Sequence, residues 1–239
     1  MSPLSKYFLS FLAAVPFLAG FPVEAGESPM RVACLGDSIT SGAKVNAAAE
    51  SYPVKLQALL GADFEVKNFG RAGATMMRIG KPNAFQELPP TAAFAPQIVI
   101  VDFGINDTRG GDVNYWGHVD EFDTDTKALL TQLLDLPTKP AVLLCLPTAN
   151  QADLPGMPDE RKQSVAERLP RLVEVRQRLQ KLAKDLANSR LSVIDLDAVT
   201  ANRPELFNVD GVHLKAEGYN LLAETLAPHV RDAAATAPK

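Results

Sequence analysis

The sequence predicts a three-layer α/β domain built around a parallel β-sheet. Five short runs of mostly apolar residues alternate with longer segments whose apolar residues repeat at helical spacing. Apolar runs bounded by Gly and Pro are typical of strands that are buried on both faces of a sheet. Because strands and helices alternate along the chain, we expect right-handed crossovers that place helices on both sides of the sheet.

The expected strands are short, and each stops at a turn or a loop. They lie at residues 30–35, 64–69, 97–103, 141–146 and 191–196. Four helices are expected, at residues 52–60, 121–136, 170–186 and 215–229, the third of them beginning at Pro170. The Ala-rich tail, residues 231–239, is expected to fray, as chain ends commonly do.

Three long connections interrupt this pattern, at residues 71–95, 108–120 and 148–159. Each follows the C-terminal end of an expected strand. In open α/β sheets, ligands bind at that edge of the sheet. Functional residues are therefore expected in the turns and loops that follow the strands.

The composition indicates one soluble globular domain. The chain has 239 residues, of which 46% are apolar and 22% charged, enough to bury a full core. The formal net charge is −4, and no block of Lys or Arg stands out. Neither nucleic acid nor an anionic membrane is therefore favoured as a partner.

The N-terminus has the pattern of a secretory signal peptide. Lys6 precedes an apolar stretch at residues 7–23, and small residues stand before a cleavage point after Ala25. The alternative is a membrane anchor, but the stretch is short for a span and contains Pro16 and Pro22.

Cleavage at that point would leave residues 26–239 as one domain, with its core at about residues 30–230. We expect a secreted or periplasmic protein with no stable membrane insertion after cleavage. The two cysteines, Cys34 and Cys145, both lie in apolar strand runs and are expected to be free buried thiols. Neither has the neighbouring ligands of a zinc site.

A serine follows the first expected strand, in the turn Gly36-Asp37-Ser38. This position would hold the Ser38 hydroxyl at the functional edge of the sheet. The tripeptide alone is also ordinary turn and helix-capping chemistry, so other residues must decide between the two interpretations.

Asp210 and His213 stand three residues apart, after the last expected strand. A serine hydroxyl is a poor nucleophile until a base removes its proton, and a histidine held by a carboxylate suits that task. Asp210 and His213 could instead merely cap the final helix. The chain has only two other histidines, His118 in a loop and His229 near the C-terminus, and neither belongs to such a motif.

Two further strand ends offer hydrogen-bond donors. Asn106, in Gly104-Ile105-Asn106-Asp107, could direct its amide at the oxyanion that forms during acyl transfer. Gly70, which ends the second strand, could offer its backbone N–H to the same oxyanion. Turn formation and strand termination are the alternative interpretations for these two residues.

The joint order of these motifs resembles the SGNH, or GDSL-type, hydrolase superfamily. The resemblance covers roughly residues 31–228. Its four blocks match here as Gly-Asp-Ser-Ile-Thr around Ser38, Asn-Phe-Gly at Gly70, Gly-Ile-Asn-Asp at Asn106, and Asp-Gly-Val-His at Asp210 and His213.

The resemblance implies a flavodoxin-like α/β/α fold with a five-stranded parallel sheet in the order 2-1-3-4-5. It implies Ser38 as nucleophile, His213 as base and Asp210 as the acid that orients it. It also implies an oxyanion hole formed by Ser38, Gly70 and Asn106. No metal or organic cofactor is implied.

Shorter matches resemble the secreted bacterial branch of sialate O-acetylesterase-like or acetyl-carbohydrate esterases. They are Ser51-Tyr52-Pro53, the stretch at residues 68–75 and Gly-Ile-Asn-Asp-Thr at residues 104–108. In the following loop, Tyr115, Trp116 and His118 are candidates for contact with a sugar ring, although the two aromatics could equally pack on the domain. Asp37 and Asp107 are further candidates for substrate contact.

The leading hypothesis is a serine esterase that removes short acyl groups, chiefly acetyl, from a carbohydrate or small-molecule ester. A lysophospholipase or thioesterase that acts on longer chains is the alternative, and Met76 and Met77 either line a small acyl pocket or pack their loop. A sugar-binding module without turnover has no need of the full set Ser38, Asp210 and His213. The sequence does not separate a hydrolase from an acyltransferase, and it indicates no oligomeric state.

Overall fold

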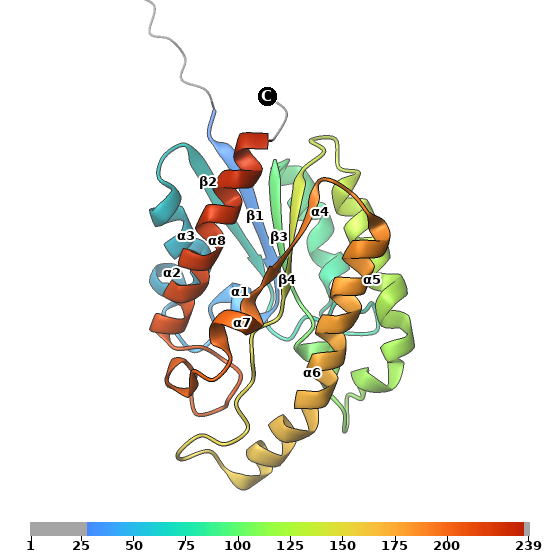
Figure 1. Cartoon of the computed structure of the whole chain (residues 1–239), viewed down its shortest axis with the longest axis vertical. Helices are drawn as coiled ribbons and strands as arrows, with labels where there is room; N and C mark the ends of the chain where they lie inside the picture. Colours follow the sequence, from blue (N-terminus) through green and yellow to red (C-terminus); the bar gives the residue numbers. More distant parts are fainter. Residues whose placement is uncertain (1–27, 237–239) are drawn as a thin grey trace, which may run out of the picture.

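Five parallel strands form the centre of the structure, a computed structural model that describes residues 28–236 (Figure 1). Their order across the sheet is β2-β1-β3-β4-β5, with every neighbouring pair parallel. The strands are β1 (Met30–Gly36), β2 (Phe64–Gly70), β3 (Ile98–Asp102), β4 (Ala141–Leu146) and β5 (Leu191–Asp195). The predicted fold class and strand order are confirmed. The expected signal peptide, residues 1–25, lies outside the described residues.

The central strands are apolar at nearly every position, apart from Arg31 near the start of β1 and Asp102 at the end of β3, because both faces of the sheet are covered. In β1, Val32 and Cys34 pack into one core, whereas Ala33 and Leu35 pack into the other. Strands β3 and β4 divide their residues between the two cores in the same way. The edge strands β2 and β5 keep several exposed residues, which explains the polar residues within them.

Helices α3 (Tyr52–Leu60) and α8 (Ala216–Thr236) pack against each other and cover one face of the sheet (Figure 1). Buried residues from both helices, such as Leu56 and Leu226, belong to the same core as Val32 and Cys34. Helix α8 runs to Thr236, so the prediction that the chain frays from residue 231 is wrong. Val230 is fully buried in this core and holds the end of the helix against the domain.

The other face is covered by α4 (Leu88–Phe94), α5 (Val119–Leu134) and α6 (Asp159–Leu186). The prediction that the third long helix begins at Pro170 is wrong, because α6 begins at Asp159 and Pro170 lies inside it. Pro170 itself is exposed to solvent. The first turns of α6 are held by tertiary contacts instead, since Val165 and Arg168 are both buried.

The long connections carry short helices that the sequence pattern did not reveal. Residues 71–95, expected to be a loop, contain α4 and the 3₁₀ turn η1 (Ala84–Glu87). The remaining short elements cap strand ends or shape loops. They are α1 (Ser38–Ser41), α2 (Ala47–Glu50), α7 (Leu196–Thr200), η2 (Asn106–Thr108), η3 (Tyr115–His118) and η4 (Pro204–Leu206).

Both cysteines are buried free thiols, as predicted. Between residues 28 and 236, no helix combines the length and the apolar character that a membrane span requires.

Candidate active site

Ser38 is the first residue of the short helix α1, directly after β1. The Asp37 carboxylate caps this helix by accepting a hydrogen bond of 2.9 Å from the backbone N–H of Ile39. The turn before it is tight, because a side chain at Gly36 would place its Cβ 1.9 Å from Thr40 Oγ1 and 2.7 Å from the Asp102 carbonyl oxygen. This turn holds Ser38 at the edge of the sheet, where it is 8% exposed.

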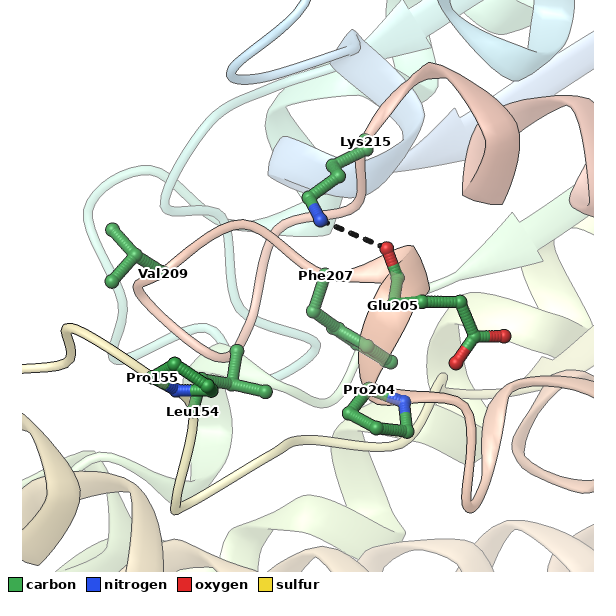
Figure 2. A pocket seen from close by; sticks show the side chains of 7 residues that line it. All are labelled: Leu154, Pro155, Pro204, Glu205, Phe207, Val209 and Lys215. Atoms are coloured by element: carbon green, nitrogen blue, oxygen red, sulfur yellow. Dashed lines mark hydrogen bonds between the residues drawn. The ribbon is translucent and has the colours of Figure 1, made fainter.

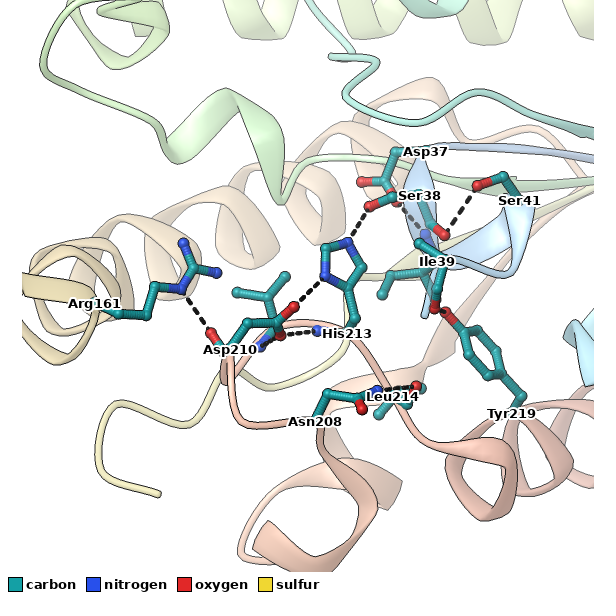
Figure 3. A network of polar contacts seen from close by, with 12 residues as sticks. Asp37, Ser38, Ile39, Ser41, Arg161, Asn208, Asp210, His213, Leu214 and Tyr219 are labelled. Atoms are coloured by element: carbon teal, nitrogen blue, oxygen red, sulfur yellow. Dashed lines mark hydrogen bonds and ion pairs between the residues drawn. The ribbon is translucent and has the colours of Figure 1, made fainter. Parts of the chain in front are cut away.

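His213 and Asp210 reach Ser38 from the loop before α8 (Figure 3). His213 Nε2 lies 2.9 Å from Ser38 Oγ, and His213 Nδ1 lies 2.7 Å from Asp210 Oδ2. The side chains of His213 and Asp210 are 21% and 22% exposed, so solvent reaches both only in part. The structure thus brings together the three residues that were predicted to act as nucleophile, base and acid.

The Asp210 carboxylate is held in its charged form. Its Oδ1 accepts hydrogen bonds from the backbone N–H groups of Val212 and His213, at 3.0 and 2.9 Å. Burial alone would raise the pKa of Asp210, but the hydrogen bonds from the His213 side chain and from these N–H groups outweigh it. The pKa of Asp210 therefore lies well below its ordinary value.

The loop that carries this pair is closed on itself. Phe207 and Leu214 form an antiparallel bridge at its ends, and the backbone N–H of Asn208 donates to the His213 carbonyl at 2.8 Å. Gly211 has φ +70°, and a Cβ there would lie 2.0 Å from the Gln151 carbonyl oxygen. Only glycine fits this position, so the shape of the loop requires the glycine of the Asp-Gly-Val-His motif.

Asn106 begins η2, directly beyond the end of β3, and is 9% exposed. Its Nδ2 donates to the Ala74 carbonyl at 3.0 Å, which fixes the direction of the amide. The second amide hydrogen makes only a long contact of 3.4 Å with Asp37 Oδ2. The protein therefore holds this second hydrogen only weakly, because contacts of this length are weak.

Gly70 does not fit the oxyanion role that the sequence assigned to it. Its backbone N–H already donates to Asn68 Oδ1 at 2.8 Å, and a Cβ on Gly70 would lie 2.3 Å from the backbone nitrogen of Ser41. Gly70 is therefore the place where β2 packs closely against α1. The prediction failed because the side chain of Asn68 satisfies this N–H.

Gly73 was missed by the sequence analysis and is better placed. It has φ +80°, and a Cβ there would have nothing within 4 Å. Its N–H has no hydrogen-bond partner among residues 28–236, and the next residue, Ala74, is the one that Asn106 binds. The sequence did contain a signal for Gly73, because a second glycine stands three residues after Gly70.

Asp37 and Asp107 are closed off from any substrate, contrary to expectation. Each is 1% exposed. Asp107 accepts hydrogen bonds of 2.9 Å from the backbone N–H groups of Met76 and Met77. It therefore ties the residue after Asn106 to the 71–95 connection. Burial raises the pKa of Asp107 to about 6, and these hydrogen bonds oppose the rise.

A second buried carboxyl lies beside Asp37. Asp102, the last residue of β3, is 2% exposed, and its Oδ2 has no hydrogen-bond partner among the described residues. The backbone N–H of Asp37 donates to the Asp102 carbonyl at 3.2 Å. Burial raises the pKa of both carboxyls. The negative charge of Asp102 raises the pKa of Asp37 further.

Tyr115 and Trp116 are partly buried and pack against the core beneath α5 and α6. The Arg171 guanidinium lies 5.8 Å from the centre of the Trp116 ring. His118 faces Glu121, with Nδ1 3.3 Å from its Oε1. These contacts explain how Tyr115 and Trp116 pack on the domain. Contact of Tyr115, Trp116 and His118 with a substrate stays a prediction.

A cavity of about 450 Å³ lies behind the Asp210 loop (Figure 2). Leu154 and Pro155 line it together with Phe207 and Val209, and Lys215 Nζ donates to the Glu205 carbonyl at 2.9 Å. None of the three residues of the Ser38 site lines it. Across residues 28–236, no three His, Cys, Asp or Glu side chains gather closely enough to hold a metal ion.

Comparison with known proteins identifies the family. The model of the GDSL-like lipase/acylhydrolase family matches residues 34–221, which include all of the site described above. The chain belongs to this family. By its description, this is a family of lipases and acylhydrolases. The recognition drawn from the four sequence blocks is confirmed at this level.

A curated relative supports the same class of reaction. The chain is 30% identical over 225 residues to a protein of Xylanibacter ruminicola described as an acetylxylan esterase, with 86% of this chain aligned. The alignment covers 44% of that relative, so the chain spans less than half of its length.

Solved structures show the same fold at lower identity. An aryl esterase of M. smegmatis is 23% identical with a TM-score of 0.69, covering 85% of this chain and 99% of that one. A carbohydrate acetylesterase of Sinorhizobium meliloti is 20% identical with a TM-score of 0.67, over 85% and 99% of the two chains. The GDSL-family fold is thus shared across relatives that differ greatly in sequence.

Proposed function

We propose that this GDSL-family protein is a serine esterase that hydrolyses short O-acyl esters, chiefly O-acetyl groups, on a carbohydrate. The observation that carries the proposal is the unbroken contact from Asp210 through His213 to Ser38, at 2.7 and 2.9 Å. This is the geometry in which a histidine can take the proton of a serine hydroxyl.

The reaction follows from the roles of these atoms. His213 Nε2 accepts the Ser38 proton while Oγ attacks the ester carbonyl carbon. The bond to the sugar oxygen then breaks, and His213 returns the proton to that oxygen, which leaves an acyl-enzyme and a free alcohol. A water molecule repeats the sequence, gives its proton to His213 and releases the carboxylic acid, after which Ser38 regains its proton.

Three donors would face the oxyanion in this proposal. They are the backbone N–H of Ser38, the backbone N–H of Gly73 and the Nδ2 of Asn106. Ser38 stands at the start of a helix, where its N–H has no intrahelical acceptor. Gly73 takes the place first assigned to Gly70, because the Gly70 N–H is already occupied. Donors held in place before the reaction stabilise the charge that develops on the carbonyl oxygen.

The acetyl and carbohydrate assignments are supported by proteins that this chain resembles. The curated relative is described as an acetylxylan esterase, and one structural neighbour as a carbohydrate acetylesterase. Met76 and Met77 are fully buried, so they pack the loop and leave no open acyl channel between them. The predicted signal peptide supports a secreted or periplasmic enzyme, which would act outside the cytoplasm.

The decisive experiment compares Ser38→Ala with Ser41→Ala in the mature protein. Both serines lie on α1, but only Ser38 contacts His213. We expect Ser38→Ala to lose hydrolysis of p-nitrophenyl acetate and labelling by a fluorophosphonate, while Ser41→Ala keeps most of both. Retained turnover in Ser38→Ala would exclude the mechanism.

A series of p-nitrophenyl esters tests the length of the acyl group. We expect kcat/KM to be highest for acetyl and to fall towards decanoyl. A rise towards decanoyl would instead favour a lysophospholipase or thioesterase. Release of acetate from acetylated xylo-oligosaccharides then tests the carbohydrate directly. Labelling of Ser38 by a fluorophosphonate would exclude a binding module without turnover, because it requires an activated serine.

A further inference from the structure

Four arginines line a second pocket of about 220 Å³. They come from two segments that are distant in sequence, the loop after η2 and the first turns of α6. The arginines are Arg109, Arg161, Arg168 and Arg171. The pocket is predominantly polar, and Glu167 is its only acidic lining residue. Such a concentration of positive charge is unexpected in a chain whose net charge is −4.

Within the part of the chain that the structure describes, the four arginines lack an ion-pair partner. Among the ion pairs of residues 28–236, none includes any of the four arginines. Glu167 is exposed and accepts a hydrogen bond from Gln163. Burial lowers the pKa of Arg168 to about 10, and the neighbouring charges of Arg161 and Arg109 add to that effect. The fold therefore holds these arginines close together although their positive charges repel one another.

Packing alone accounts for only part of this arrangement. Arg168 donates to the Ile105 carbonyl and to Thr108 Oγ1, and Arg171 donates to the Thr108 carbonyl. These bonds brace the turn that carries Asn106, but carbonyl oxygens do not cancel a full positive charge. The side chain of Arg109 is exposed and makes no hydrogen bond within residues 28–236. A bracing role therefore leaves Arg109 unexplained.

The pocket adjoins the candidate active site on two sides. The Arg161 Nε donates to the Asp210 carbonyl at 2.7 Å, and Figure 3 shows this side chain directed at the Asp210 loop. On the other side, Arg168 binds the carbonyl of Ile105, the residue next to Asn106. A substrate held at Ser38 could therefore extend a polar group into the pocket.

We propose that this pocket binds a carboxylate on the carbohydrate, so that the enzyme acts on acetylated sugars that carry a uronic acid. The planar guanidinium presents paired N–H donors that match the two oxygens of a carboxylate. The substrate class rests on the proposed esterase function, but the binding step can be tested without turnover.

Binding is measured with the mature protein and oligosaccharides that carry no acetyl group. The probe is a xylo-oligosaccharide with one glucuronate, and its match is the neutral oligosaccharide of the same length. We expect the glucuronate compound to bind roughly ten-fold or more tightly, as charge-assisted hydrogen bonds imply. Equal affinity would overturn the proposal, and so would tighter binding of inorganic phosphate than of the glucuronate compound.

Two variants locate the effect. Arg109→Gln and Arg171→Gln each remove one charge, and each should lose most of the preference for glucuronate. Lys184→Gln is the control, since it removes an exposed charge near the far end of α6, about 20 Å along the helix from Arg171. A preference that survives in both arginine variants would contradict the assignment.

Turnover separates this inference from the proposed function. Acetylated forms of the two oligosaccharides are compared by release of acetate. Turnover of both with equal affinity for the two probes would reject the carboxylate pocket and keep the esterase. Selective glucuronate binding without release of acetate from either would keep the pocket and reject the carbohydrate esterase. Faster release from the glucuronate compound, lost in Arg109→Gln, supports both.

Discussion

Replacing Asp210 by Asn tests the proposed role of the acid with little change of shape. Asp210 Oδ1 accepts two backbone N–H groups, and Oδ2 faces His213 Nδ1. In the variant, the amide oxygen must take the Oδ1 position because the two N–H groups need an acceptor. The amide NH₂ then faces Nδ1 and donates to it. The single proton of a neutral imidazole is thereby forced onto Nε2, the atom that lies 2.9 Å from Ser38 Oγ.

A histidine with its proton on Nε2 cannot accept the proton of Ser38. A wrong tautomer of this kind lowers kcat by about 10⁴ in serine hydrolases that use such a triad. That loss corresponds to roughly 5.4 kcal/mol of transition-state stabilisation. We therefore expect Asp210→Asn to lose ~10⁴ in kcat for p-nitrophenyl acetate, with a smaller change in KM.

The assay is steady-state hydrolysis near neutral pH, with thermal unfolding as the control for folding. Because the two backbone N–H bonds are retained, the variant should stay folded at the assay temperature. A kcat within ten-fold of the unmodified enzyme, in a folded variant, would refute the tautomer argument.

Two more predictions concern Asn106 and Asp102. Asn106→Ala should lower kcat by ~10²–10³ through the loss of one oxyanion donor; a change confined to KM would show a binding role instead. Asp102 has a raised pKa in the folded state, so the folded protein binds its proton more tightly. The free energy of unfolding should then fall as pH rises above the unfolded value of about 3.9. Asp102→Asn removes this effect. The melting temperature of the variant minus that of the unmodified protein should therefore increase from pH 4 to pH 7. A constant difference across that range would contradict the argument.

Much of the fold could be predicted because its signals are local. The central strands are apolar along most of their length, since both of their faces are buried. Ser38 and Asn106 lie just beyond strand ends, and a parallel sheet gathers those ends at one edge. Asp210 and His213 lie further on, in the loop that follows β5, α7 and η4. The sequence order of these motifs was therefore sufficient to predict which side chains meet.

The failures have two different causes. Pro170 suggested a helix start, but the buried contacts of Val165 and Arg168 hold the turns of α6 that precede it. These contacts join segments that are distant in sequence, so the local pattern does not reveal them. The choice between Gly70 and Gly73 depends instead on a local turn, in which the side chain of Asn68 occupies the N–H of the residue two positions later.

The arginine pocket could not be seen in the sequence for a similar reason. Its four side chains are scattered between residues 109 and 171, and no basic block unites them. Only the packing of α6 against the η2 turn brings them together. The predicted signal peptide and the sialate branch of the family stay predictions.

The self-closed loop of residues 207–214 has a consequence for motion. It carries both the base and its acid, and its own bridge and hydrogen bonds fix their mutual distance. Displacement of the loop as a body would therefore carry Asp210 and His213 together and leave their hydrogen bond intact. Such a displacement would break the contact between His213 and Ser38, which joins parts of the chain 175 residues apart. It would also break the hydrogen bonds that tie the loop to Arg161 and to the backbone of Gln151, so these two bonds keep the base within reach of Ser38.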